Sequence, residues 1–219
     1  MNVIDLGQKD YKEVWDLQKK VHKKRVENKI DNTLLLVEHT PVITMGKSGK
    51  AGNILFTPDA LKAKGISYYD IERGGDVTYH GPGQLVGYPV FNVKQGLAGI
   101  RPFVNKMEDA IIRTLADFDI TAEKKEKMIG VLVQGKKICS IGIAVKRWVS
   151  FHGFALNINT DMDHFNLIVP CGLKNITMTS MELILGKKVK LDDVKKSVVE
   201  SFSSVFQTDA EEKCLDEII

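Results

Sequence analysis

The sequence predicts a single α+β or mixed α/β domain. Three observations lead to this class: a length of 219 residues, clusters of consecutive strand patterns, and helical patterns that separate these clusters without regular β-α-β alternation. A chain of this length buries roughly 70% of its unfolded surface, which is enough for one core. We expect the domain to span residues 1–207 and an acidic, mobile tail to occupy residues 208–219.

The first half of the chain shows the pattern of one helix followed by three strands. Apolar residues at helical spacing predict the helix over residues 9–27. Short apolar runs of buried-strand length predict the strands over residues 33–38, 41–45 and 66–71. A loop with three glycines, at residues 46–52, separates the second strand from the third.

The second half shows two amphipathic helices with strands between them. Helical spacing of apolar residues predicts helices over residues 103–118 and 191–205. Residues 131–133, 138–145 and 149–158 follow one another as strand patterns with short connections, which predicts a hairpin or meander.

The composition excludes several classes of protein. The chain is 43% hydrophobic and 27% charged, and no apolar run approaches the roughly 18 residues of a membrane-spanning helix. The net charge of +3 is too small to indicate a nucleic-acid partner. The first residues do not resemble a secretory signal, and the three cysteines have no C-x-x-C spacing. We therefore expect a cytoplasmic protein with reduced thiols and neither a membrane nor a nucleic-acid partner.

One stretch differs from the rest of the chain in charge and glycine content. Residues 77–93 contain no Asp, Glu, Lys or Arg, and five of the 18 glycines lie between residues 73 and 90. Glycines allow positive φ angles and close approach of the backbone to a ligand, and Pro82 stiffens the turn. Residues 73–84 are therefore interpreted as a binding wall with one cation and one imidazole. A tight hairpin whose glycines serve only the turn is the alternative.

The three cysteines differ in the reactivity that we expect of them. Cys171 lies between Pro170 and Gly172, in an irregular backbone that could leave a thiol accessible. Cys139 lies within a strand pattern, and Cys214 lies among acidic residues that disfavour a thiolate. Both a nucleophile and a packing role remain open for Cys171. The histidines lack metal-ligand spacing, so no metal site is expected.

The stretch from Arg73 to Pro89 resembles the signature of the lipoyl(octanoyl) transferases of lipoate biosynthesis. Three further blocks follow in the order of that family, at residues 137–142, 152–157 and 170–172. The resemblance covers about residues 30–185. It implies a mixed sheet flanked by helices, similar to the catalytic domain of lipoate ligases and biotin protein ligases.

The resemblance also implies an activity and its partners. Such an enzyme moves an octanoyl group from octanoyl-acyl carrier protein, through a cysteine thioester, to a specific lysine of apo lipoyl domains. The acceptors would be the lipoyl domains of 2-oxoacid dehydrogenases and the glycine-cleavage H protein, in the first step of endogenous lipoate synthesis. No cofactor is implied, and we expect a monomer.

Position by position, the resemblance implies Cys171 as the nucleophile and Lys137 as the group that activates it. Lys137 would act either as an ammonium that stabilises the thiolate or as a general base. His80 would position the acyl carbonyl, orient Lys137 or serve a structural role. The implied acyl pocket consists of Arg73, Gly74, Gly75, Asp76, Val77, Thr78, Tyr79 and His80, together with Ser140, Ile141 and Gly142, and with Gly153, Phe154 and Ala155.

The main alternative is an ATP-dependent lipoate or biotin-type ligase on the same fold. Such a ligase activates a free carboxylate as an adenylate and does not require a cysteine. Asp76 directly follows two glycines, where its carboxylate would repel a phosphate. A non-catalytic binding module is a further alternative, but it would not need Lys137 and Cys171 together. The chain departs from the family at Leu132, where a tryptophan is common, and this difference affects the expected shape of the pocket.

Overall fold

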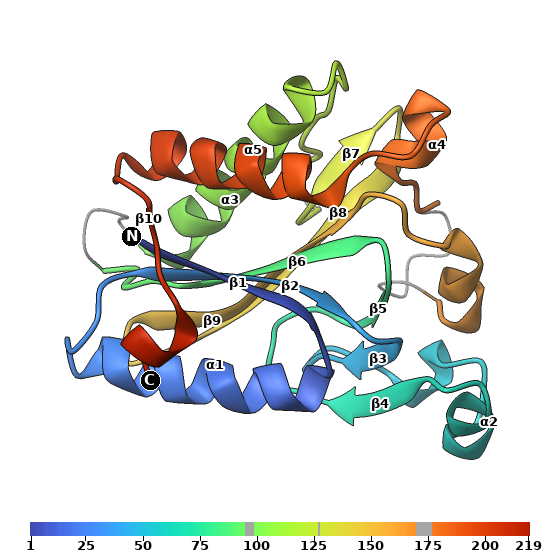
Figure 1. Cartoon of the computed structure of the whole chain (residues 1–219). Coiled ribbons are helices and arrows are strands. Elements are labelled where there is room, and N and C mark those ends of the chain that lie inside the picture. The colour runs from blue at the N-terminus through green and yellow to red at the C-terminus, as the bar shows by residue number, and fades with distance from the viewer. Residues whose placement is uncertain (95–98, 127, 170–176) are drawn as a thin grey trace.

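The protein consists of two β-sheets with helices packed against them (Figure 1). The structure is a computed structural model that describes residues 1–94, 99–126, 128–169 and 177–219. The larger sheet is mixed, because it contains both parallel and antiparallel neighbouring strands. The expected mixed sheet flanked by helices is thereby confirmed.

Within the described residues, the larger sheet has seven strands in the order β10-β1-β2-β6-β9-β8-β7. Their bounds are β1 Asn2–Lys9, β2 Thr33–His39, β6 Gln84–Val90, β7 Val131–Val133, β8 Lys136–Lys146, β9 Val149–Asn157 and β10 Glu211–Glu212. The smaller sheet has the order β4-β3-β5. Its strands are β3 Val42–Met45, β4 Ser67–Asp70 and β5 Val77–His80.

The helices lie on both faces of the larger sheet. The α-helices are α1 Tyr11–Val26, α2 Pro58–Ala63, α3 Ile100–Ala116, α4 Met181–Leu185 and α5 Leu191–Phe206, and the 3-10 helices are η1 Ala51–Asn53, η2 Met162–Leu167 and η4 Leu215–Glu217. Figure 1 shows α3 and α5 on one face and α1 on the opposite face. In the described part of the chain, no helix is long and apolar enough to cross a bilayer.

Strand β2 is buried on both faces, which explains its uninterrupted apolar sequence. Leu34 and Leu36 belong to the cluster formed with α3 and α5, whereas Leu35 and Val37 belong to the cluster formed with α1. Successive side chains of a strand point to opposite faces, so a strand between two helical layers needs apolar residues at every position.

Helix α1 begins one residue after Asp10. The carboxylate of Asp10 accepts hydrogen bonds from the backbone N–H groups of Lys12, at 2.8 Å, and Glu13, at 3.4 Å. These bonds satisfy donors that have no partner within the helix. The predicted helix at residues 9–27 is therefore confirmed, and its N-terminus is set by this cap.

The glycine-containing segment is not a hairpin. Strand β5 pairs with β3 in the smaller sheet, whereas β6 pairs with β2 and β9 in the larger sheet. Residues 81–83 thus carry the chain from one sheet to the other. The hairpin interpretation is wrong, because the same turn residues serve here to change sheets.

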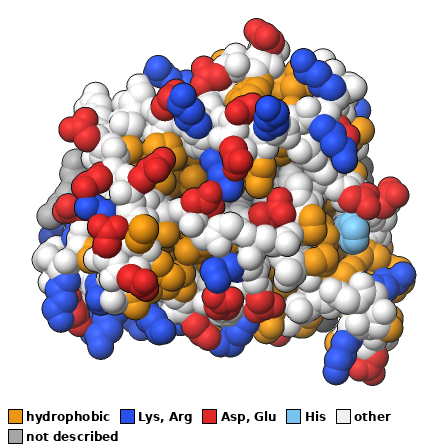
Figure 2. All heavy atoms as spheres, viewed as in Figure 1, with side chains coloured by type: hydrophobic (Ala, Val, Ile, Leu, Met, Phe, Trp, Pro, Cys, Tyr) orange, Lys and Arg blue, Asp and Glu red, His pale blue; other side chains and the backbone are white. Residues whose placement is uncertain are grey.

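Residues 208–219 are packed against the domain. Strand β10 pairs with β1, and the amino group of Met1 donates to Thr208 Oγ1 at 3.1 Å. Ile218 is 4% exposed and joins the cluster beneath α1. Acidic and basic side chains are interspersed on this face (Figure 2), and Lys195 of α5 forms an ion pair with Asp5 of β1 at 2.7 Å. These contacts hold the C-terminal residues against β1 and α1.

Candidate active site

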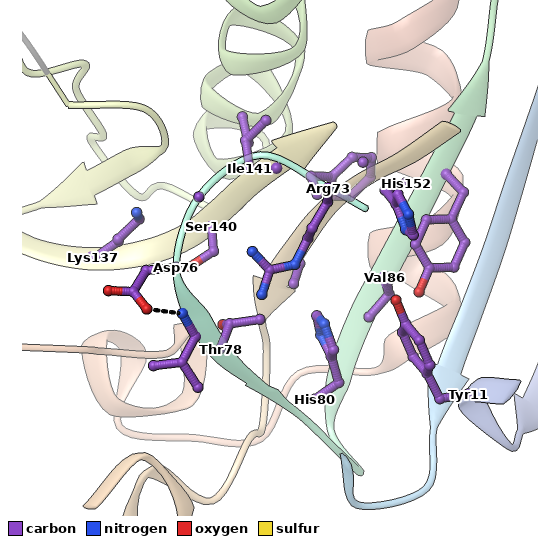
Figure 3. Close-up of a pocket in the computed structure, with 17 residues that line it drawn as sticks. Tyr11, Arg73, Asp76, Thr78, His80, Val86, Lys137, Ser140, Ile141 and His152 are labelled. Carbon is purple, nitrogen blue, oxygen red and sulfur yellow. Dashed lines mark hydrogen bonds between the residues drawn. The ribbon is translucent and has the colours of Figure 1, made fainter. Parts of the chain in front are cut away.

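A pocket lies where the smaller sheet meets strands β8 and β9 of the larger sheet (Figure 3). Its cavity has a volume of about 50 Å³. It is lined by Tyr11, Arg73, Gly75, Asp76, Val77, Thr78, His80, Val86, Tyr88, Lys137, Ser140, Ile141, Gly142, His152, Gly153, Phe154 and Ala155. Segments far apart in the sequence therefore form one wall.

Twelve of the fourteen predicted pocket residues line this pocket, and Gly74 and Tyr79 do not. Side chains alternate along β5, so Tyr79 points away from the pocket while its neighbours point into it. Its ring stacks on His164 with centroids 4.8 Å apart. The backbone N–H of Gly74 donates to Ile143 of β8 at 2.9 Å, and this bond joins the glycine segment to the larger sheet.

Lys137 is buried at the edge of the pocket, whereas Cys171 lies outside the described residues. Lys137 is 5% exposed, and its Nζ donates to the carbonyl oxygen of Ile129 at 2.9 Å. Its backbone N–H donates to Thr177 at 2.8 Å, and its carbonyl oxygen accepts from Thr179 at 2.9 Å. The lysine is thus anchored to the first described residues that follow the segment 170–176.

A close approach of the backbone at Gly130 makes room for Lys137. A Cβ atom at this position would lie 2.6 Å from Cε of Lys137 and 2.5 Å from the carbonyl oxygen of Cys139. The φ angle of Gly130 is +126°, which residues with a side chain rarely adopt. Glycine at this position therefore allows the ammonium to turn back onto the preceding carbonyl.

Arg73 and Asp76 place opposite charges in the pocket. The guanidinium of Arg73 donates to the carbonyl oxygen of Thr44 at 2.8 Å and to its hydroxyl at 3.0 Å. The carboxylate of Asp76 accepts from the N–H of Val77 at 2.7 Å and from the amide of Asn53 at 2.5 Å. Figure 3 shows Asp76 on the side of the pocket that holds Lys137.

Four lining residues, Tyr11, Val86, Tyr88 and His152, were not among the predicted pocket residues. The sequence pattern places Tyr11 only within the helix predicted over residues 9–27, whereas in the structure it lines the pocket from the start of α1. Tyr88 and His152 lie inside the motif blocks at residues 73–89 and 152–157, and these blocks were the signal that could have identified them.

A buried imidazole and a partly exposed carboxylate, His152 and Glu72, lie behind the pocket. Burial lowers the pKa of His152, whose Nε2 lies 3.5 Å from a carboxylate oxygen of Glu72. Burial also acts on Glu72, but the contact with His152 and the charge of Lys19 outweigh it and lower the pKa of Glu72 to about 2. The indole of Trp15 donates to Glu72 at 3.0 Å. The imidazole and the carboxylate therefore form a polar pair behind the pocket.

Cys139 does not line the pocket, although it is close to Lys137 in sequence. Its side chain belongs to the cluster between the sheet and α3. Burial raises the pKa of the Cys139 thiol to about 12, so this thiol stays protonated. Among the described residues, no group of His, Cys, Asp or Glu side chains is arranged to hold a metal ion.

The substitution Gly130→Ala tests the close contact with Lys137. We expect it to lower the free energy of unfolding by ~3–5 kcal/mol, because backbone strain and the collision with Lys137 and Cys139 add. The matched control is Gly135→Ala, where φ is +75° but the space is open, and its expected loss is ~1–2 kcal/mol. Urea denaturation measures both values, and equal losses would contradict the contact.

Acid should destabilise the protein through its buried imidazoles. Burial lowers the pKa of His39 to about 4 and that of His80 to about 3, whereas both lie near 6.5 in the unfolded chain. Below pH 6.5 the unfolded chain therefore binds protons that the folded chain does not, and stability falls by ~1.4 kcal/mol per pH unit for each imidazole.

The variant His39→Gln should reduce this slope by ~1.4 kcal/mol per pH unit between pH 6 and 5. The wild type, measured in the same buffers, is the reference for this slope. Urea unfolding at several pH values gives the slope. An unchanged slope in His39→Gln would show that its imidazole is not held neutral.

Comparison with known proteins identifies the family. Residues 10–203 match the lipoyl protein ligase A/B catalytic domain. An octanoyltransferase of Caldicellulosiruptor saccharolyticus is 47% identical over 208 residues, which cover 94% of this chain and 88% of the relative.

Two solved structures share the fold. A bi-partite lipoate protein ligase of Thermoplasma acidophilum has a TM-score of 0.74 at 15% identity, covering 99% of this chain and 89% of that one. A biotin protein ligase of Aquifex aeolicus has a TM-score of 0.54 at 14% identity, covering 94% and 69%. The chain therefore belongs to the lipoyl protein ligase A/B catalytic domain family, among its octanoyltransferase members.

Proposed function

We propose that this enzyme transfers an octanoyl group from octanoyl-acyl carrier protein to a lysine of apo lipoyl domains, through a thioester on Cys171. The observation that carries the proposal is the 47% identity with an octanoyltransferase over 94% of the chain. The acceptors that we propose are the lipoyl domains of 2-oxoacid dehydrogenases and the glycine-cleavage H protein. We further propose that the enzyme acts in the cytoplasm as a monomer.

The reaction has two steps that each exchange one bond at the acyl carbon. The thiol of Cys171 gives up its proton, its thiolate attacks the donor thioester, the carbon–sulfur bond to the carrier breaks, and the carrier leaves as a thiol with that proton. The lysine amine then attacks the new thioester, a carbon–nitrogen bond forms, and the thiolate of Cys171 leaves and takes up the proton that the amine loses. In our proposal the ammonium of Lys137 stabilises the Cys171 thiolate in both steps.

The lining of the pocket supports an acyl substrate. The apolar part of the lining consists of Val77, Val86, Ile141 and Phe154. The side chain of Arg73 also lines the cavity (Figure 3). A cavity of about 50 Å³ holds only a few water molecules. We therefore propose that an eight-carbon chain enters as the lining side chains move apart.

An ATP-dependent ligase remains the second candidate, because the fold is shared with lipoate protein ligases. The position of Asp76 argues against it. Its carboxylate lines the pocket and already accepts two hydrogen bonds, so a phosphate group there would meet a negative charge.

Intact-protein mass spectrometry tests the proposed nucleophile. Mixed with octanoyl-acyl carrier protein without ATP, the wild type should gain the mass of one octanoyl group, and Cys171→Ala should gain none. Cys139→Ala and Cys214→Ala are the matched controls and should still form the adduct. An undiminished adduct on Cys171→Ala would overturn the proposal, and transfer that requires ATP and free octanoate would favour the ligase.

The rate of alkylation tests the proposed role of Lys137. Lys137→Ala should slow the reaction of Cys171 with iodoacetamide at pH 7 by about tenfold, because loss of a neighbouring cation reduces the fraction of thiolate. Lys136→Ala removes an exposed charge from the adjacent position of β8 and should leave the rate unchanged. If both variants react like the wild type, Lys137 does not activate the cysteine.

A further inference from the structure

The imidazole of His80 has one nitrogen with a defined partner. His80 ends β5, lines the pocket and is 6% exposed, and Figure 3 shows its ring pointing into the cavity toward Arg73. Its Nδ1 lies 2.8 Å from Oε1 of Gln84, the first residue of β6. In a neutral imidazole one nitrogen donates and the other accepts, so the partner of Nδ1 decides what Nε2 can do.

The side-chain amide of Gln84 can have only one orientation. Its Nε2 donates to the carbonyl oxygen of Tyr79 at 3.2 Å and to Oδ1 of Asn157 at 2.8 Å. A backbone carbonyl oxygen only accepts, so a reversed amide would place two acceptors against each other. Oε1 of Gln84 must therefore face His80, and Nδ1 of His80 must carry the proton that this oxygen accepts.

The orientation of Asn157 is fixed in the same way. Its Nδ2 donates to the carbonyl oxygen of Thr179 at 3.0 Å, which turns its Oδ1 toward Gln84. Gln84 and Asn157 are directly opposite in the β6–β9 register, and each is 1% exposed. Little solvent can therefore replace these bonds. All the hydrogen bonds of this chain, which we call the relay, are donated in the same direction: from His80 to Gln84, from Gln84 to Asn157, and from Asn157 to the backbone of Thr179.

We propose that Gln84 and Asn157 are positioning residues that hold the proton of His80 on Nδ1, so that its Nε2 accepts a hydrogen bond from the acyl-accepting amine. The role of the amine rests on the proposed octanoyl transfer, whereas the position of the proton does not. The amine N–H donates to Nε2, and its lone pair is thereby directed at the thioester carbon. The carbon–nitrogen bond then forms, the bond to the Cys171 sulfur breaks, and the proton lost by the amine passes to that sulfur. His80 orients the amine and keeps its own proton.

The surroundings of His80 agree with this role. Burial, with a smaller contribution from His39, lowers the pKa of His80, so the ring is uncharged at neutral pH. Tyr11 stacks on the ring with centroids 5.9 Å apart and planes at 8°, and His39 meets it edge-on at 6.0 Å. A fixed, neutral ring whose Nε2 has no proton cannot donate to an acyl carbonyl. Of the roles expected from the sequence, positioning the acyl carbonyl is therefore not the one we propose.

Nitrogen NMR of the full-length protein labelled with 15N-histidine measures the tautomer directly. In the wild type we expect His80 to carry its proton on Nδ1, with Nε2 unprotonated at pH 7, and the variant His80→Gln assigns the signal. A proton on Nε2 in the wild type would contradict the proposal that Gln84 and Asn157 hold the proton of His80 on Nδ1. This result does not depend on whether the protein transfers octanoyl groups, so failure of the relay and failure of the proposed function are distinguishable.

Gln84→Met keeps the volume of the side chain and removes the relay. We expect a mixture of His80 tautomers and a loss of about tenfold or more in the rate of transfer from the acyl-enzyme to the amine. The rate of acyl-enzyme formation and the KM for the donor should change by less than about twofold. Asn157→Asp should keep the wild-type tautomer, because its carboxylate still accepts the hydrogen bond from Nε2 of Gln84 and so leaves Oε1 of Gln84 facing His80.

The matched control is Asn159→Asp. Asn159 lies just beyond β9 and exchanges two hydrogen bonds with the backbone of Val189, outside the relay. It should keep the wild-type tautomer and the wild-type rate of transfer. If Gln84→Met retains both as well, Gln84 does not position His80. If its tautomers mix while transfer stays at the wild-type rate, Nε2 does not serve the amine.

Discussion

The site depends on the antiparallel register of β6 against β9. This register places Gln84 opposite Asn157 and Val86 opposite Ala155. In the first pair, Gln84 forms a hydrogen bond with His80 and Asn157 fixes the orientation of Gln84. The second pair forms part of the pocket wall. A shift by one residue would turn both pairs to the other face of the sheet. The helical layers on both faces oppose such a shift, because β6 is buried along its whole length.

Strand β8 extends this arrangement to the buried lysine. Its pairing with β9 places Ser140 opposite Ala155 and Ile141 opposite Phe154, and all four residues line the pocket. At the start of the strand, the backbone of Lys137 pairs with residues 177 and 179. The carbonyl of Thr179 in turn accepts the hydrogen bond of Asn157. The lysine and the imidazole relay therefore share one backbone anchor.

Much of the fold could be predicted from the sequence, because most elements bury a defined face. Helices α1, α3 and α5 have apolar residues at helical spacing, and β2 is apolar throughout because both of its faces are covered. Strand β1 was not predicted. Its register with β2 is irregular between Asp5 and Gln8, so its side chains do not alternate cleanly. The change of sheet at residues 81–83 was missed because a hairpin and a crossover need the same turn residues.

The residues of the site were predicted unevenly for a similar reason. The family resemblance led to the runs around Arg73, Ser140 and Gly153, because they are continuous in sequence and twelve of their residues line the pocket. Tyr11 joins the pocket only through the packing of α1 against the sheet, and no local pattern reports that contact. The relay through Gln84 and Asn157 was also missed, since it depends on a cross-strand register.

A crystal structure of the octanoyl-enzyme, prepared without an acceptor, would test the central claim most directly. The account predicts density for the acyl chain in the pocket between Thr78 of β5, Ile141 of β8 and Gly153 of β9, with Nε2 of His80 facing the thioester. An acyl chain bound elsewhere, for example in the groove between α5 and the C-terminal segment around Val199 and Leu215, would contradict it.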